Sequence, residues 1–201
     1  MGAAVLAAAL AVLRERGYAG FAVEAVAARA GTTKAAVRRR WPVRQGLVID
    51  ALAAVVATPP APDNDCTRCD LTDSVLLLAR ALQEELPRGV LAPLLADCAA
   101  DPALHRRLVD TLIEPSRTAA ATAVRRALDR RELRPETDPE LFTDLLASTV
   151  YQRALFGAAP VDRATAGRLV DLLLRGVAVD FDRLVEISRL PRTARAAAHP
   201  R

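Results

Sequence analysis

Residues 22–47 read AVEAVAARAGTTKAAVRRRWPVRQGL, and the spacing within this stretch decides the predicted fold. Two short segments with apolar residues at helical spacing lie on either side of Gly31, a residue type that commonly ends a helix in the left-handed conformation. Thr33 is placed to cap the second segment, 34–40, and Trp41-Pro42 ends it. Four basic side chains lie on this second segment: Lys34, Arg38, Arg39 and Arg40. The stretch therefore predicts two short helices joined by a tight turn, the second of them cationic.

A helix-turn-helix makes strict demands on sequence because its two helices cross closely. The first helix needs a small residue at the crossing, the turn needs glycine, and the second helix needs an apolar side chain that faces back. Ala27, Gly31 and Val37 meet these three needs. The basic side chains then face outward, as in proteins whose second helix reads the DNA major groove. The plainer alternative is a solvated basic face without a partner.

The composition predicts an all-α protein. Of the 201 residues, 52% are hydrophobic and only 3% are aromatic, so the core must be filled by Ala, Leu and Val, of which Ala and Leu favour helices. The apolar spacing predicts helices at 3–16, 23–30, 34–40, 43–57, 71–86, 90–100, 102–131, 138–157 and 161–187. Pro115 should kink or divide the helix that contains it.

Proline and polar residues divide the chain into parts. We expect a three-helix, helix-turn-helix DNA-binding domain over 1–57, with the fourth helix as its connector, and a linker at 58–65. A helical ligand-binding and dimerisation domain is expected over 71–187. The tail 188–201 has too little apolar content to fold and is predicted to be disordered.

Charge is distributed unevenly along the chain. The net charge is +4, yet residues 1–50 hold eight basic and three acidic residues, and residues 188–201 hold four arginines and no acid. Such asymmetry is typical of a polyanion-binding N-terminal unit joined to a more acidic body. No segment reaches the roughly eighteen apolar residues that a bilayer crossing needs, so we expect no membrane partner and a cytoplasmic protein.

Motifs for catalysis and metal binding are sparse. The sequence has no GxSxG, no glycine-rich phosphate loop and no HExxH, so we predict no catalytic residue and no cofactor. Its three cysteines are Cys66, Cys69 and Cys98, the first two spaced as CxxC. A single CxxC can be a redox pair, half of a zinc site, or a pair of incidental thiols; the last is favoured here, and no metal site is predicted.

The residues around the turn resemble the DNA-binding domain of TetR-family transcriptional regulators. The resemblance runs from Ala8 to Leu52 and is carried by ERGYAGFAVEAVAARAG (Glu15–Gly31), Thr33-Lys34, Arg39-Arg40-Trp41-Pro42 and Leu47. The phrase DPELFTDLLASTVYQRALF (Asp138–Phe156) looks like the ligand-binding and dimerising part of that family. The resemblance implies a homodimeric repressor whose two cationic helices enter successive major grooves of a pseudo-palindromic, double-stranded DNA operator. A small-molecule effector would release it.

The resemblance also assigns roles to residues. It implies DNA contacts by seven side chains: Tyr18, Thr33, Lys34, Arg38, Arg39, Arg40 and Arg44. Tyr18 is equally consistent with packing, and Trp41 is expected to pack between the first and fourth helices. The family usually has Tyr at the position of Arg38, where an arginine either reads a guanine or adds charge. It often has Thr or Ser at the position of Ala36.

By the same resemblance, helices 138–157 and 161–187 form the dimer interface. A stripe on the second of them fits a buried face: Leu169, Leu172, Leu173 and Val177. Six residues are candidates for the effector pocket: Leu95, Cys98, Leu112, Leu146, Val150 and Tyr151. Because few of them are polar, we expect an apolar or aromatic effector, although each also suits an ordinary core position.

Two alternative functions stay open. One is a ligand-binding or protein-interaction dimer of the same fold that has lost operator recognition. The other is a redox- or metal-responsive regulator that acts through Cys66 and Cys69.

Overall fold

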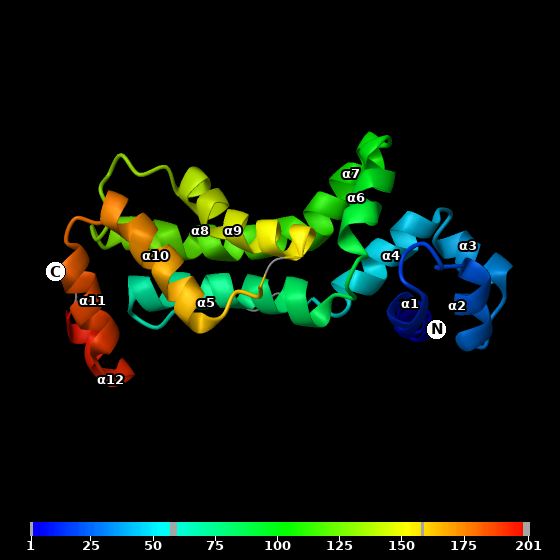
Figure 1. Ribbon diagram of the computed structural model, residues 1–201, viewed down its shortest axis with the longest axis horizontal. Helices are drawn as coiled ribbons and strands as arrows, with labels where there is room; N and C mark the ends of the chain where they lie inside the picture. The colour runs from blue at the N-terminus through cyan, green and yellow to red at the C-terminus, as the bar shows by residue number, and fades with distance from the viewer. Residues whose placement is uncertain (1, 57–59, 158, 199–201) are drawn as a thin grey trace. The chain divides into compact units, whose positions relative to one another are not determined.

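The computed structural model, which describes residues 2–56, 60–157 and 159–198, is built from helices (Figure 1). No strand occurs among these residues, and an isolated bridge joins Leu133 to Ala178. The predicted all-α class is confirmed. In chain order the elements are α1 (Gly2–Arg16), α2 (Val23–Arg29), α3 (Lys34–Arg40), α4 (Arg44–Ala53), α5 (Thr67–Arg80), a π-helical segment (Ala81–Glu85), α6 (Leu91–Ala99), α7 (Pro102–Leu108), a second π-helical segment (Val109–Ile113), α8 (Glu114–Asp129), α9 (Pro139–Phe156), α10 (Arg163–Val177), α11 (Phe181–Arg189), α12 (Arg192–Arg195) and a 3-10 turn (Ala196–Ala198).

The helices divide into two compact units. The first comprises Met1–Ala57 and Gln83–Pro115, and the second comprises Thr58–Leu82 and Ser116–Arg201. This division differs from the predicted domain over 71–187, because 83–115 pack with the N-terminal helices. The reason lies in α4, which is buried on most of its circumference and packs against α1 and also against α6 and α7. A helix that buries apolar residues on most of its faces needs partners on more than one side.

The first unit contains the helix-turn-helix that the sequence predicts. Gly31 follows α2 with φ +64°, a conformation that glycine adopts without a steric cost. Val37 of α3 is 1% exposed, and α3 packs on α2, where Val26 is also buried. α3 ends at Arg40 because Pro42 disfavours the helical conformation in the residue before it, and Trp41 has a non-helical conformation with φ −125° and ψ 86°.

In the second unit α5 packs against α9, α10 and α11. Its core contains the side chains of Leu71, Val75, Phe142, Leu146, Val150, Val170 and Leu174. α9 has local signals at both ends. The Asp138 carboxylate accepts from the N–H groups of Glu140 and Leu141 at 2.9 and 3.2 Å, and Gly157 ends the helix with φ +72°.

The predicted helix 102–131 is interrupted by a π-helical segment, Val109–Ile113, which ends two residues before Pro115. It consists of α7, the second π-helical segment and α8. Proline has no N–H to donate to the carbonyl four residues earlier, so the regular hydrogen-bond ladder cannot continue through this point.

The predicted helix 161–187 is corrected, since it consists of α10 and α11. Ala178 between them is extended, and the N–H of Val179 donates to the carbonyl of Glu132 at 3.0 Å. Asp180 then starts α11 by accepting from the N–H of Arg183 at 2.9 Å. The helix is therefore interrupted where the backbone pairs with Glu132, although the apolar pattern of the sequence continues through this point.

The tail 188–201, predicted to be disordered, is also corrected for its described residues. α11 extends to Arg189, and 192–198 form α12 and the 3-10 turn, whereas 199–201 lie outside the described residues. The guanidinium of Arg195 donates to the carbonyl of Leu190 at 3.0 Å, and that of Arg183 donates to the carbonyl of Ala198 at 2.8 Å. Hydrogen bonds from arginine side chains to backbone carbonyls thus stabilise the segment 190–198, which has few large apolar residues.

Candidate nucleic-acid interface

The cationic face of α3 is exposed. Arg38, Arg39 and Arg40 are all solvent-exposed, and among the described residues neither Arg38 nor Arg39 makes a hydrogen bond or an ion pair. The Arg40 guanidinium lies over the Trp41 ring, 4.9 Å from its centroid. Because a cation over an indole ring keeps its charge, all three guanidinium groups remain able to pair with an anion.

The start of α3 is held by its own residues. The Thr33 hydroxyl oxygen accepts a hydrogen bond from the N–H of Ala36 at 3.1 Å, which confirms the predicted cap. The hydrogen of the Thr33 hydroxyl stays available to donate to a phosphate. Lys34 forms an ion pair with Glu24 of α2, and the hydrogen bond from Lys34 is the main cause that lowers the pKa of Glu24. Such an exposed pair contributes little to stability, so Lys34 can exchange Glu24 for a phosphate at small cost.

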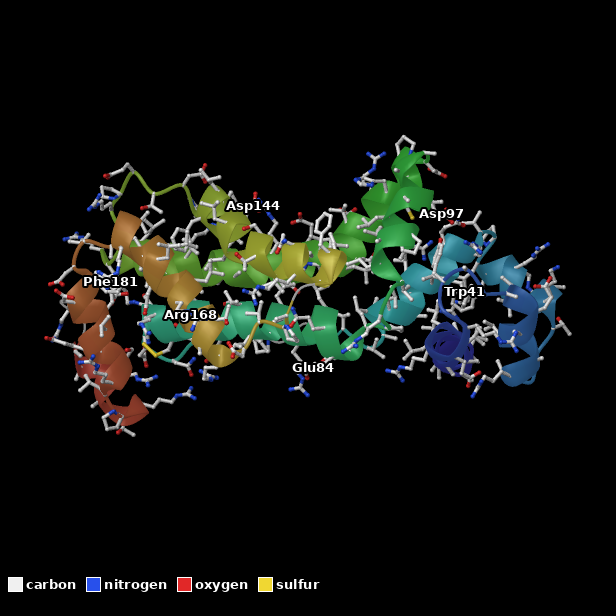
Figure 2. The ribbon with its side chains drawn as sticks, in the orientation of Figure 1. Trp41, Glu84, Asp97, Asp144, Arg168 and Phe181 are labelled. Carbon is white, nitrogen blue, oxygen red and sulfur yellow. A yellow bond between two sulfur atoms is a disulfide. The ribbon has the colours of Figure 1, made fainter. Side chains whose placement is uncertain are left out.

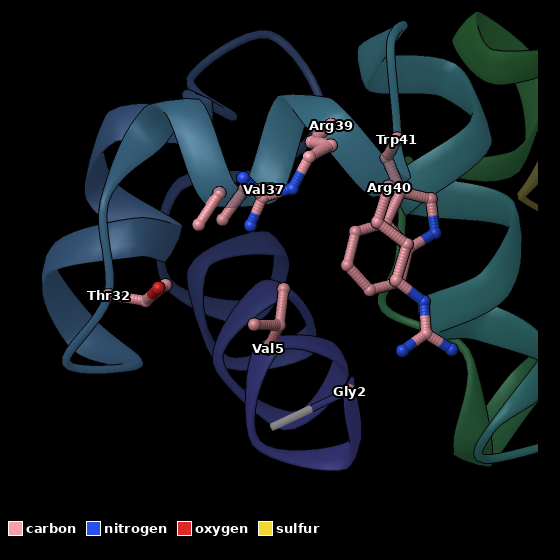
Figure 3. Close-up of a pocket in the computed structure, with 8 residues that line it drawn as sticks. Gly2, Val5, Thr32, Val37, Arg39, Arg40 and Trp41 are labelled. Carbon is pink, nitrogen blue, oxygen red and sulfur yellow. The ribbon is translucent and has the colours of Figure 1, made fainter.

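A cavity of about 370 Å³ lies between the start of α1 and α3 (Figure 3). Gly2 and Val5 of α1 line it together with Thr32 and the side chains of Arg39 and Arg40. A Cβ at Gly2 would lie 2.5 Å from an Arg40 nitrogen, so the backbone of α1 closely approaches this guanidinium. Sequence reasoning missed Gly2 and Thr32, because only packing brings the two helices together.

Trp41 is a packing residue, as predicted. It is 4% exposed, and its Nε1 donates to the carboxylate of Asp50 in α4 at 2.8 Å. The other oxygen of Asp50 accepts from Arg107 of α7 at 2.7 Å. Asp50 therefore joins the end of α3 to α7 within the first unit.

Tyr18 and Arg44, both predicted DNA contacts, form an intramolecular cluster with Asp97 of α6 (Asp97 is labelled in Figure 2). The Tyr18 hydroxyl donates to Asp97 Oδ2 at 2.8 Å, and Arg44 donates to the same oxygen at 3.1 Å. The Arg44 guanidinium lies 4.6 Å from the centroid of the Tyr18 ring. In the structure both side chains contact Asp97, so a DNA contact by either one requires that it exchange this carboxylate for a phosphate. The sequence gives no sign of this partner, which lies 79 residues after Tyr18.

The cluster sets the protonation of its members. Burial, and then the hydrogen bond to Asp97, raise the pKa of Tyr18 to about 12. The hydrogen bonds from Tyr18 and then Arg44 lower the pKa of Asp97. The tyrosine is thus neutral and the carboxylate ionised over the whole physiological range.

The six predicted pocket residues fall into two groups. Leu95, Cys98 and Leu112 belong to the first unit, and Leu146, Val150 and Tyr151 belong to the second. Leu146 and Val150 are members of the core of the second unit. The structure therefore does not gather the six into one site within either unit.

The CxxC pair is joined, since Cys66 and Cys69 form a disulfide, while Cys98 is free and buried. Across the described residues, no group of three or more His, Cys, Asp and Glu side chains is placed to hold a metal ion. Nor does any helix in the described ranges combine the length and the apolar content of a membrane span.

Comparison with known proteins extends this picture over most of the chain. Residues 5–51 match the family model described as bacterial regulatory proteins, tetR family, and residues 61–173 match the tetracyclin repressor-like C-terminal domain. The DNA-binding transcriptional repressor TetR of Mycobacteroides abscessus is 32% identical over 174 residues, which cover 86% of this chain and 90% of the relative. An uncharacterised HTH-type transcriptional regulator of Mycobacterium tuberculosis is 30% identical over 83% of this chain and 82% of its own length.

Solved structures of TetR-family regulators are also similar to this chain. The TetR family transcription regulator SCO0332 superposes with a TM-score of 0.70 at 29% identity, covering 88% of this chain and 97% of that protein. A TetR transcriptional regulator from Agrobacterium tumefaciens has a TM-score of 0.67 at 23% identity, covering 92% and 98%, and supports the fold alone.

Proposed function

The chain belongs to the TetR family of DNA-binding transcriptional regulators, which are not enzymes, and on that premise we propose that it is a homodimeric repressor released from a pseudo-palindromic operator by a small molecule. The observation that carries the proposal is α3, a helix capped by Thr33 whose exposed Arg38 and Arg39 make no hydrogen bond or ion pair with any residue that the structure describes. The name of the Mycobacteroides abscessus relative supports repression. Binding a chromosomal operator also requires a cytoplasmic location.

The three arginines of α3 have different expected roles. Arg38 stands where the family usually has a tyrosine, and its exposed guanidinium suits a guanine edge in the major groove. Arg39 and Arg40 line the cavity beside the start of α1 and suit phosphate oxygens. Thr33 and Lys34 add phosphate contacts at the start of the helix.

The experiment is a fluorescence anisotropy titration on the promoter upstream of the protein's own gene and on random DNA, at several salt concentrations. Arg38→Ala should cost about 1–3 kcal/mol on the operator only, whereas Arg39→Ala should weaken both DNAs and reduce the salt slope by about one. Arg189→Ala is the matched control, because it removes an exposed arginine from the second unit.

An exposed apolar stripe supports the homodimer. Leu141 and Leu145 lie one turn apart on α9 and are 57% and 44% exposed, and Leu172 of α10 is 71% exposed. Leucines rarely remain this accessible on neighbouring helices unless another surface covers them. A second copy, related by a two-fold axis, would cover the stripe with the same residues. Within the predicted stripe on α10, Leu169, Leu173 and Val177 pack partly on the core of their own unit, so Leu172 is the member available to a partner.

The second unit also offers room for an effector. A cavity of about 830 Å³ is lined by apolar residues, among them Leu76 and Leu77 of α5, and by six charged ones: Asp63, Asp73, Arg80, Arg126, Arg163 and Arg192. Because the four arginines outnumber the two carboxylates, the cavity favours an effector that has an apolar part and an acidic group. Thermal shifts with aromatic carboxylates, and none with the matching alcohols, would support this preference.

The alternative, a dimer of the same fold without operator recognition, predicts a different titration. Binding would then be weak, indifferent to DNA sequence and abolished by salt in all variants alike. A sequence-selective complex that Arg38→Ala weakens contradicts this alternative.

A further inference from the structure

The proposed function makes no use of the CxxC motif at the start of α5. Cys66 is the N-cap residue of that helix and is 0% exposed, and Cys69, one turn later, is partly exposed. The two are joined as a disulfide, and Cys66 Sγ also accepts from the N–H of Cys69 at 3.2 Å. A CxxC at a helix N-terminus favours the thiolate form, which is the reactive form in disulfide exchange.

Cys69 forms part of the wall of a cavity of about 470 Å³ between α5 and α10. The charged side chains of this cavity are Arg68, Arg163, Arg168, Arg195, Asp73 and Asp171. Arginines therefore outnumber carboxylates around the accessible sulfur. The disulfide is drawn as a yellow bond, and Arg168 is labelled, in Figure 2.

Ion pairs neutralise only part of this charge. Arg68 donates to both oxygens of Asp171 at 2.6 and 3.0 Å, and Arg163 pairs with Asp73 at 3.3 Å. Arg168 donates to the hydroxyl of Thr165 at 3.0 Å. The hydrogen bond from Thr165 is the main cause that lowers the pKa of Asp162, and the charge of Arg168 adds to it. Arg195 donates to backbone carbonyls. Because four arginines and two carboxylates line the cavity, the excess of positive charge raises the local concentration of anions.

We propose that Cys66 and Cys69 form a reversible thiol–disulfide site that exchanges with small anionic disulfides through the cavity. Starting from the reduced protein, the Cys69 thiolate attacks one sulfur of an external disulfide, RSSR, and a thiolate, RS⁻, leaves. The Cys66 thiolate then attacks Cys69 Sγ, forms the protein disulfide and expels the second RS⁻. Two electrons pass from the protein to RSSR, and the two thiol protons end on two molecules of RSH.

The order of attack follows from burial. Cys66 cannot meet an external disulfide because its sulfur is covered, whereas Cys69 lines the cavity. In the reverse direction an external thiolate attacks Cys69, and Cys66 leaves as a thiolate at the helix start, where the N–H of Cys69 can still donate to it. A disulfide in a reducing compartment is usually redox-sensing or catalytic, so reversibility fits a cytoplasmic regulator.

The test measures rates of oxidation of the full-length reduced protein, followed by alkylation and mass spectrometry. Three symmetrical disulfides serve as probes: dithiodipropionate, which is anionic, hydroxyethyl disulfide, which is neutral, and cystamine, which is cationic. Each rate is divided by the rate of the same reagent with the urea-unfolded chain. The anionic probe should react about tenfold faster than the cationic one at low salt, and high salt should remove the difference.

Variants locate the effect. Arg168→Gln should reduce the anionic preference, while Arg189→Gln, an exposed arginine outside the cavity, should leave it unchanged. Cys98→Ser should have no effect, since Cys98 is buried in the first unit. Equal normalised rates for the three probes, or a Cys69→Ser variant whose Cys66 reacts as fast as Cys69, would overturn the proposal. Since no DNA is present, the outcome is independent of operator binding.

Discussion

Replacing Tyr18 by Phe separates the two roles that this residue could play. The change removes only the hydroxyl, which donates to Asp97 Oδ2 at 2.8 Å, and keeps the ring that packs beneath Arg44. Hydrogen bonds to charged groups contribute about 1.5–3 kcal/mol. The side chain of Asp97 is 40% exposed, so water can replace the Tyr18 hydroxyl at this carboxylate. We therefore expect Tyr18→Phe to lower the free energy of unfolding by about 1–2 kcal/mol.

The assays are urea unfolding and DNA titration on the same preparations. If Tyr18 belongs to the cluster, stability falls, while the salt slope of DNA binding stays unchanged. A phosphate contact would give the opposite result, with unchanged stability and a slope reduced by about one. That second result would refute the reasoning. Arg38→Ala is the reciprocal control, because it should weaken DNA binding and leave the urea midpoint unchanged.

The pH dependence supplies a second check with a defined sign. The pKa of Tyr18 is raised from 10.0 to about 12 in the folded protein, so the unfolded chain loses this proton first as the pH rises. The stabilising contribution is therefore complete below pH 10 and is lost as the pH rises towards 12. The stability difference between the parent protein and Tyr18→Phe should shrink across this interval, and a constant difference would contradict the assignment.

Four further changes test the packing and assembly. Val37→Ala removes two buried methyl groups from the contact of α3 with α2 and should cost about 1–3 kcal/mol in urea unfolding, with no loss if that contact is absent. Asp138→Ala removes the cap of α9 and should cost about 1 kcal/mol by the same measurement. Leu172→Asp should give a monomer in sedimentation velocity, whereas Val43→Asp, an exposed apolar position outside α9 and α10, should remain a dimer. Reduction of the Cys66–Cys69 disulfide, which closes a loop of three-residue separation, should lower the free energy of unfolding by about 2 kcal/mol, and an unchanged midpoint would show that the reduced state is equally constrained.

Features that depend on neighbours within a few residues could be predicted from the sequence alone. The cap at Thr33, the turn at Gly31 and the end of α3 before Pro42 follow from local hydrogen bonding and backbone sterics, so the helix-turn-helix and its exposed arginines were found without coordinates. The same holds for α9, with Asp138 at its start and Gly157 at its end.

Only the tertiary structure decided which distant groups pair. It assigned Tyr18 and Arg44 to Asp97, joined 83–115 to the N-terminal helices, interrupted 161–187 at Ala178 and surrounded Cys69 with arginines. Helical periodicity shows which face of a helix is buried, but many apolar faces fit one another about equally well. The choice among them depends on packing and on polar partners that lie tens of residues apart along the chain.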